Sequence, residues 1–253
     1  MTRFKNRQWL PAFLLFLFLS GAAGNRQVND VLYQVSTISA LLGGILDGEV
    51  SFQQLGEHGN FGLGTFDALD GDMIELRHQF FQVSADGAVR KVKPLAKTPF
   101  AMTTFFEPDR SINTKQSMDY KQLQTFIEDN LESKNILYAI EIKGRFKNVK
   151  VRSVHKQTPP YPGLNEAVKN QALFEYGDIS GTMVGFYCPQ LARGVNNPGF
   201  HFHFLSDDLK KGGHVLDLSS TSIKISIDPT DNFFLTLPHS QKFIQAEIEP
   251  GKQ

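Results

Sequence analysis

Alternation of apolar and polar positions dominates the second half of the chain. From Gly181 onward, short segments are alternating, β-branched or aromatic: TMVGFYCP, GFHFHFL, HVLDLSS, SIKISID and FFLTLP. Because successive side chains of a strand point to opposite faces of a sheet, this period of two residues predicts β-strands. Residues 136–154 share the pattern, and Lys143-Gly144 within them is predicted to be a turn.

The first half of the chain also favours strands, and turn residues separate them. Asp70-Gly71 and Asp86-Gly87 are signals for tight turns between strands. Residues 31–45 begin with a strand pattern, but their later apolar residues are too dense for periodicity to assign. The other strands expected in this half are residues 61–66, 73–83 and 99–106.

Three segments predict helices. In residues 119–133, apolar side chains recur every three or four positions, which is the spacing of one helix face. Residues 51–56 have the pattern of a short capped helix, and residues 164–176 are expected to form another. The predicted fold class is therefore α+β and sheet-dominated, with mixed or antiparallel sheets in two layers or subdomains and a few helices. We expect β-rich subdomains at residues 24–125 and 126–253, the second of which binds a metal for the reasons below.

Residues 1–23 have the order of a secretory signal peptide. Three basic residues come first, an apolar run follows at residues 10–19, and small residues precede the expected cleavage before Gly24. The run is shorter than the roughly 20 residues that a membrane span requires. An uncleaved buried helix or membrane anchor is the alternative. We expect an exported protein, periplasmic or secreted, without a membrane attachment after cleavage.

Composition and charge exclude several classes of protein. The 253 residues are 41% hydrophobic and 21% charged, which is typical of a globular protein rather than a disordered one. The formal net charge is zero, and removal of three basic leader residues would make it −3, which gives no electrostatic basis for binding nucleic acid. A single cysteine, Cys188, excludes an intramolecular disulfide and a multi-cysteine zinc site.

Histidine and phenylalanine alternate in residues 199–205 (GFHFHFL). In a strand, the three phenylalanines would share one face and form core, and His201 and His203 would share the other. The two imidazoles would lie about 7 Å apart along the strand, because each residue advances about 3.3 Å.

A third histidine, His214, follows the turn residues 211–213 (KGG). If the flanking strands pair as a hairpin, His214 lies across from His201 and His203. Three neutral imidazoles with no cysteine nearby suit a divalent metal, and three protein ligands leave coordination positions for a substrate. The alternative is a polar sheet face of hydrogen-bonded histidines, but the pattern as a whole favours a metal site.

The chain resembles the α-acetolactate decarboxylases over roughly residues 30–248. The motifs that carry the resemblance are specific only in combination. They are residues 62–71 (GLGTFDALDG), 97–101 (KTPFA), 150–154 (KVRSV), 157–162 (QTPPYP), 185–187 (GFY), 198–203 (PGFHFH) and 212–216 (GGHVL).

This resemblance implies a zinc enzyme that converts (S)-2-acetolactate to (R)-acetoin and carbon dioxide, and a homodimer. It implies that the zinc ligands are His201, His203 and His214, with another divalent transition metal as the alternative occupant. It also implies an active-site role for Arg152. The family's glutamate after the Leu-Asp-Gly turn falls on Asp72, whose side chain is one methylene shorter.

A second acidic residue of the family lies in a C-terminal tail, and we expect this chain to end before that position. Glu247 and Glu249 are the candidates to replace it. Thr65, which precedes the Leu-Asp-Gly turn, is a candidate to hydrogen-bond the substrate, and a structural role is its alternative.

Decarboxylation of a 2-hydroxy-3-oxo acid requires a group that takes up electrons when carbon dioxide leaves, and the neighbouring ketone does so as an enediolate. A divalent cation would stabilise that charge as a Lewis acid. Arg152 is suited to hold a carboxylate or enediolate oxygen, and a carboxyl such as Asp72 to deliver the proton to carbon. Local sequence alone favours an ion-pair role for Arg152 and allows a turn role for Asp72.

Two other functions fit the histidines. Cupin-type metal oxygenases also carry two histidines in an HxH pattern, usually followed four residues later by a glutamate, a position that Asp207 occupies here. An exported, non-catalytic metal-binding β protein is the second alternative, and it predicts metal binding without turnover.

Overall fold

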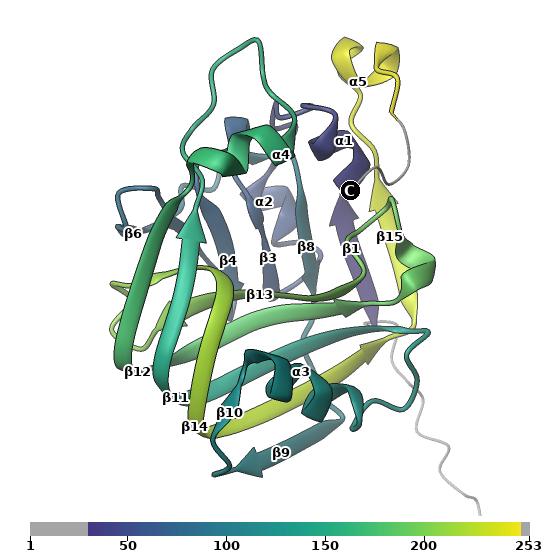
Figure 1. Ribbon diagram of the computed structural model, residues 1–253. Helices are drawn as coiled ribbons and strands as arrows, with labels where there is room; N and C mark the ends of the chain where they lie inside the picture. The colour runs from purple at the N-terminus through teal and green to yellow at the C-terminus, as the bar shows by residue number, and fades with distance from the viewer. Residues whose placement is uncertain (1–29, 249–253) are drawn as a thin grey trace, which may run out of the picture.

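Two β-sheets make up most of the molecule, as the computed structural model shows for residues 30–248 (Figure 1). The predicted signal peptide and Glu249 lie outside these described residues. The sheet-dominated α+β class predicted from the sequence is confirmed. None of the helices in the described residues has the length and apolarity to cross a bilayer.

The first sheet has seven strands in the order β15-β1-β8-β3-β4-β5-β6. Its strands pair antiparallel, except that β15 runs parallel to β1. A separate two-stranded ladder pairs β2 (Val50–Ser51) with β7 (Lys97–Thr98). The seven strands are β1 (Val31–Val35), β3 (Phe61–Thr65), β4 (Asp72–Leu76), β5 (Gln79–Val83), β6 (Val89–Lys91), β8 (Ala101–Thr104) and β15 (Asn232–Thr236).

The second sheet is built on three long strands that curve across the molecule (Figure 1). β11 pairs with β12 and with β14, and β13 pairs with both β12 and β14, so these four strands close on themselves at one end. Its members are β9 (Arg110–Thr114), β10 (Met118–Asp119), β11 (Leu137–Ser153), β12 (Ala172–Cys188), β13 (Gly199–Ser206) and β14 (Gly212–Thr230). Each sheet therefore draws strands from both halves of the chain, because β9 and β10 precede residue 125 and β15 returns to the first sheet.

The turn predicted at Lys143-Gly144 is wrong, because β11 continues through it without interruption. Gly144 is required there by close packing: a Cβ atom at this position would lie 2.2 Å from the backbone oxygen of Ser222 on β14. The glycine thus marks close contact between two strands rather than a reversal of the chain.

Residues 73–83 form a hairpin of β4 and β5 rather than one strand. The connecting residues Arg77 and His78 both have positive φ, at 52° and 60°. Such a turn usually carries asparagine or glycine, so these two side chains give no sequence signal for it. By contrast, the predicted turn at Asp86-Gly87 does connect β5 to β6.

Two of the three predicted helices are confirmed, and the third is largely wrong. α3 (Tyr120–Glu128) begins after Asp119, whose carboxylate accepts from the backbone N–H of Gln122 at 2.8 Å. α2 (Phe52–Leu55) has a capping box at Ser51. In residues 164–176, only α4 (Leu164–Ala167) and the 3-10 turn η2 (Val168–Asn170) are helical. The remaining short helical elements are α1 (Ile38–Leu42), η1 (Asp67–Leu69), η3 (Gln190–Ala192) and α5 (Gln241–Gln245).

Residues 172–176 belong to β12 because they pair with residues 149–153 of β11. The backbone hydrogen bonds of that long ladder override the local helical pattern of this segment. Tertiary pairing of this kind cannot be read from periodicity within the segment itself.

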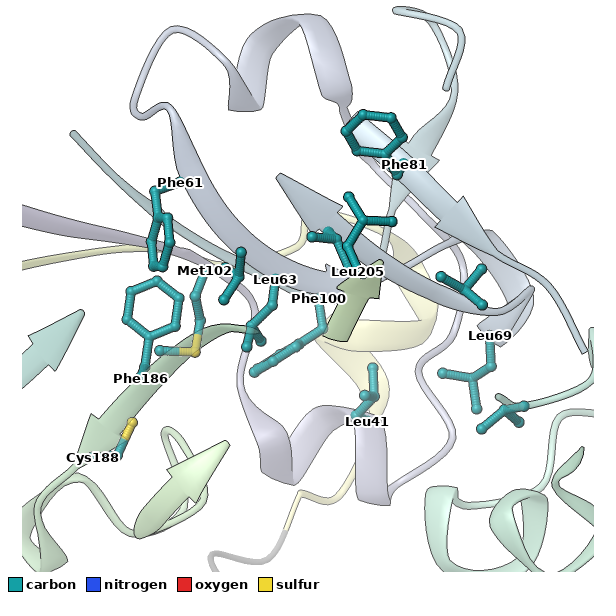
Figure 2. Close-up of a cluster of buried hydrophobic side chains, with 14 of the residues drawn as sticks. Leu41, Phe61, Leu63, Leu69, Phe81, Phe100, Met102, Phe186, Cys188 and Leu205 are labelled. Atoms are coloured by element: carbon teal, nitrogen blue, oxygen red, sulfur yellow. The ribbon is translucent and has the colours of Figure 1, made fainter. Parts of the chain in front are cut away.

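Apolar side chains from both sheets meet in a shared core (Figure 2). Phe61 on β3 and Met102 on β8 pack in one cluster with Phe186 on β12 and Leu205 on β13. The ring centroids of Phe61 and Phe186 are 6.0 Å apart. Cys188 lies in the same core, where burial raises the pKa of its thiol to about 12. This core fixes the two sheets against each other and so fixes residues of β4 relative to β11, β13 and β14.

Candidate metal and active site

The hairpin of β13 and β14 brings three histidines together. His203 lies directly opposite His214 in the strand register, as the sequence predicted, and His201 lies two residues before His203 on the same face. The Nε2 atom of His201 is 3.1 Å from Nε2 of His203 and 3.0 Å from Nδ1 of His214. The third separation, from Nδ1 of His214 to Nε2 of His203, is 3.3 Å.

The opposite face of β13 forms core, which confirms the second half of that prediction. Phe202 and Phe204 are buried in the core of the second sheet, and Phe200 packs against it. The two faces of one short strand therefore have different roles. The phenylalanine face anchors the strand, and the histidine face is held rigidly in place by that packing.

All three imidazoles are neutral near neutral pH. Burial lowers the pKa of His203 to about 3 and lowers the pKa values of His201 and His214 well below the usual range, and the charge of Arg152 acts in the same direction. Nδ1 of His203 lies 2.8 Å from the carbonyl oxygen of Met73. Because a carbonyl oxygen only accepts, Nδ1 carries the ring proton and donates a hydrogen bond to that oxygen. Nε2 of His203 therefore presents a lone pair to the other two histidines.

The donor set fits a divalent transition metal. Neutral imidazole is the form that binds a metal, and a carbonyl that accepts from the other ring nitrogen is the usual support for such a ligand. Zinc–nitrogen bonds of about 2.0–2.1 Å in tetrahedral geometry place two ligand atoms about 3.3 Å apart. The observed separations of 3.0–3.3 Å agree with that spacing. Three imidazoles do not by themselves choose between zinc and its neighbours in the transition series.

Asp72, the first residue of β4, reaches this cluster from the other sheet. Its Oδ1 atom is 3.7 Å from Nη1 of Arg152 and 3.8 Å from Nε2 of His203. Its side chain is almost fully buried, and its Oδ2 atom has no hydrogen-bond partner among the residues that the structure describes. Burial raises the pKa of Asp72 to about 6, and the positive charge of Arg152 opposes that rise.

Arg152 is positioned by the long ladder between β11 and β14. It lies directly opposite His214, so both side chains point to the same face of the second sheet. Thr65 lies opposite Asp72 in the first sheet, and its hydroxyl donates to the carbonyl of Gly71 at 2.7 Å. Thr65 thus holds the turn from which Asp72 projects, which is the structural role left open by the sequence.

One cavity of about 390 Å³ contains all six predicted site residues. It lies between the two sheets, and its remaining wall is made by apolar side chains and by amides. Sequence reasoning did not identify the amide side chains, because they come from segments without a recognisable motif. The amides are Asn165, Gln171, Asn196 and Asn197, and the apolar residues include Leu41, Phe100 and Val168.

Other candidates lie elsewhere. Glu247 follows α5 and is not among the described residues that line the cavity. Asp207, the position of the cupin glutamate, is exposed in the turn after β13 and is likewise outside the cavity lining. Glu247 therefore lies outside the described lining of the cavity, and its role as the second acidic residue stays a prediction.

Comparison with known proteins gives one consistent result. Residues 32–250 match the family model described as alpha-acetolactate decarboxylase. The alpha-acetolactate decarboxylase of Methanosarcina mazei is 43% identical over 229 residues, covering 90% of this chain and 80% of the relative. That of Brevibacillus brevis is 41% identical over 226 residues, covering 89% of this chain and 79% of the relative. The crystal structure of alpha-acetolactate decarboxylase from Bacillus subtilis strain 168 is similar with a TM-score of 0.85 at 36% identity, covering 87% of this chain and 94% of that one.

Proposed function

The chain belongs to the alpha-acetolactate decarboxylase family and is a decarboxylase of acetolactate, and from that premise we propose that it converts (S)-2-acetolactate to (R)-acetoin and carbon dioxide with a divalent metal. The metal would be held by His201, His203 and His214, and we propose zinc. One observation carries the proposal: three neutral imidazoles converge within 3.3 Å of one another beside a partly buried arginine and a buried carboxyl. Neither a cupin-like oxygenase nor a non-catalytic binding protein is favoured by the family assignment.

The reaction needs stabilisation of the negative charge that appears on the substrate when carbon dioxide leaves. A divalent cation bound at the three histidines would supply a Lewis acid for that charge. Arg152 acts from the neighbouring strand. Its planar guanidinium offers paired donors, so it attracts the substrate carboxylate and then the developing enediolate oxygen.

Asp72 is the candidate for the group that transfers a proton to carbon. It is the carboxyl closest to the histidines among the described cavity residues, and its Oδ2 atom has no hydrogen-bond partner within residues 30–248. Because it approaches from the first sheet while the histidines lie on the second, it faces the substrate from one side. Delivery of the proton from a single side is what a product of one configuration requires.

The apolar side chains that line the cavity contribute by excluding water. Leu41, Phe100 and Val168 surround the space beyond the charged groups. They exclude water from the substrate, which strengthens the interaction of Arg152 with a developing anion because the local dielectric is low.

The direct test is acetoin formation from racemic 2-acetolactate by the purified chain of residues 24–253, with and without a chelator. The rate of spontaneous decarboxylation is subtracted, and the configuration of the acetoin is determined by chiral chromatography. We expect chelator-sensitive formation of (R)-acetoin that consumes half of the racemate rapidly. Turnover that is unaffected by complete removal of bound metal would contradict the proposed mechanism.

We also propose that the chain is exported after cleavage before Gly24 and that it forms a homodimer. The order of basic, apolar and small residues at positions 1–23 supports the first proposal, and the family resemblance supports the second. N-terminal sequencing of the protein recovered outside the cytoplasm tests the cleavage site. Light scattering on that protein tests the dimer, and a mass of one chain would contradict it.

A further inference from the structure

Gln171 lines the cavity that holds the proposed metal site, and its side-chain oxygen Oε1 is buried without a hydrogen-bond partner in the described residues. Within residues 30–248, six buried side-chain oxygen atoms make no hydrogen bond. Two of the six belong to residues that line this cavity, namely Oδ2 of Asp72 and Oε1 of Gln171. Asp72 already has a proposed role, whereas Gln171 has none. A buried acceptor without a donor is costly, and rotation of this terminal amide toward the cavity, where a ligand can supply the donor, would remove that cost.

The strand register places Gln171 beside Arg152. Leu173 of β12 lies directly opposite Arg152 of β11, and Ala172 lies opposite Ser153. Gln171 precedes β12 with an extended backbone (φ −68°, ψ 147°), so its side chain is on the same side as that of Leu173. Gln171 is therefore the diagonal neighbour of Arg152 on the cavity face.

The backbone before Gln171 is anchored. Its N–H donates to the carbonyl of Val168 at 3.3 Å, and Leu164 and Val168 pack against the core between the sheets. The amide is thus carried by a fixed segment rather than by a free loop. A hydrogen-bonding group that is fixed in this way can discriminate between ligands.

The chemistry of the substrate identifies the matching group. At neutral pH, 2-acetolactate has a carboxylate and a ketone, which only accept hydrogen bonds, and one hydroxyl, which donates. We propose that Oε1 of Gln171 accepts a hydrogen bond from the 2-hydroxyl of the substrate and so selects 2-hydroxy-3-oxo acids over 3-oxo acids that lack this hydroxyl. This inference rests on the activity proposed above and names a specificity-determining residue for it.

The test compares two substrates and three variants. 2-Methyl-3-oxobutanoate has the carboxylate and ketone of 2-acetolactate but hydrogen in place of the hydroxyl. Gln171→Met removes the acceptor at similar size, and Gln53→Met makes the same change at an exposed position of α2 outside the cavity. Gln171→Glu keeps an acceptor and adds a charge that affects both carboxylate substrates alike. Metal content and circular dichroism are measured for every variant.

We expect Gln171→Met to lower kcat/KM for 2-acetolactate roughly tenfold, as the loss of one hydrogen bond does, and to leave kcat/KM for 2-methyl-3-oxobutanoate within about twofold. Gln53→Met should change neither value. Gln171→Glu should preserve the ratio of the two values. Acetoin and butanone differ by the same hydroxyl, and their inhibition of 2-acetolactate decarboxylation gives this comparison with two compounds that are not themselves decarboxylated. Only the inhibition constant of acetoin should rise in Gln171→Met.

Three results would overturn the inference. An equal loss for both substrates in Gln171→Met would mean that the side chain only shapes the cavity. No loss for either would mean that Oε1 does not contact the substrate. If Gln171→Glu lowers the ratio of the two kcat/KM values as much as Gln171→Met does, the contact would be assigned to the amide N–H instead. Failure of the wild-type protein to decarboxylate 2-acetolactate would instead contradict the proposed function, so the two failures are distinguishable.

Discussion

Strand β4 carries two buried carboxyl groups, Asp72 and Glu75, which lie on opposite faces of the first sheet because they are three residues apart. Asp72 faces the cavity, where Arg152 and His203 approach it within 4 Å. Glu75 faces the other side, where it accepts a hydrogen bond from the hydroxyl of Thr103 at 2.5 Å. Burial is similar, but within the described part of the chain only Asp72 has a cation beside it.

Burial raises the pKa of both groups, to about 6 for Asp72 and to about 8 for Glu75. The charge of Arg152 opposes the rise for Asp72, and a neutral hydroxyl opposes it for Glu75. Two carboxyls on one strand thus differ mainly in what the opposite sheet brings to them. We infer that the cavity face of β4 serves the reaction and that the other face affects stability alone.

The largest loss of activity is expected for a variant that lacks one of the three proposed metal ligands. His203→Ala deletes a metal ligand and should reduce acetoin formation to the spontaneous background, because the Lewis acid that stabilises the developing negative charge is lost with the metal. Elemental analysis should show the metal lost together with the activity. Full activity in a variant without metal would contradict the assignment of the ligands.

Asp72→Asn tests the cavity face of β4 directly. We expect a loss in kcat of roughly 10²–10⁴-fold, the usual contribution of a group that transfers a proton. Metal content should be unchanged, since Asp72 is not one of the three ligands. Asp72→Glu retains a carboxyl group and should keep most of the activity that Asp72→Asn loses. This comparison shows that the carboxyl group is what the reaction requires. A wild-type rate in Asp72→Asn would place the proton donor elsewhere.

Arg152→Ala should lower kcat/KM roughly 10²–10³-fold while the metal stays bound, because one charge-stabilising donor is lost. Arg152→Lys retains the charge but not the paired donors, and an intermediate rate is expected. Measurement of both at saturating metal separates the contribution of charge from that of geometry. If Arg152→Ala has normal kinetics, the arginine serves only as an ion-pair partner of Asp72.

Glu75→Gln should leave the activity unchanged and alter stability instead. The folded-state pKa of Glu75 is raised from 4.5 to about 8, so between these values the folded state retains a proton that the unfolded state releases. The free energy of unfolding of the wild-type protein should therefore fall as pH rises from about 4.5 to about 8, by up to a few kcal/mol from this one group. Glu75→Gln removes that contribution.

Urea denaturation of both proteins at pH 5 and pH 8 tests this assignment. Glu75→Gln should gain stability relative to the wild type at pH 8 and show little difference at pH 5. Equal pH dependence in the two proteins would mean that Glu75 ionises freely in the folded state. Reduced turnover in Glu75→Gln would break the comparison between the two faces of β4.

The sequence pattern predicted those elements whose contacts are between residues close together in the chain. His201, His203 and His214 are joined by one short hairpin, so alternation and a KGG turn were enough to bring them together. The helix predicted within residues 119–133 was likewise visible from its apolar spacing, and the structure confirms it as α3 (Tyr120–Glu128). Both elements depend on residues close in sequence.

Long-range contacts were beyond such reasoning. Asp72 meets His203 across the two sheets, a relation between residues far apart in the chain, and only the family resemblance indicated it. The Lys143-Gly144 pair predicts a turn from local sequence, because the close approach of Gly144 to β14 has no local signature. Gln171 lay in a segment predicted to be helical, and its place beside Arg152 follows only from the pairing of β11 with β12.

Reconstitution of the metal-free protein tests the central claim most directly. The chain is stripped with a chelator, zinc is added in steps, and bound zinc and acetoin formation are measured on the same samples. Activity should rise in proportion to bound zinc and reach its maximum at one ion per chain, and His203→Ala should show neither. Turnover by the stripped protein before any metal is added, or one bound ion per chain without turnover, would contradict a metal-dependent decarboxylase at these three histidines.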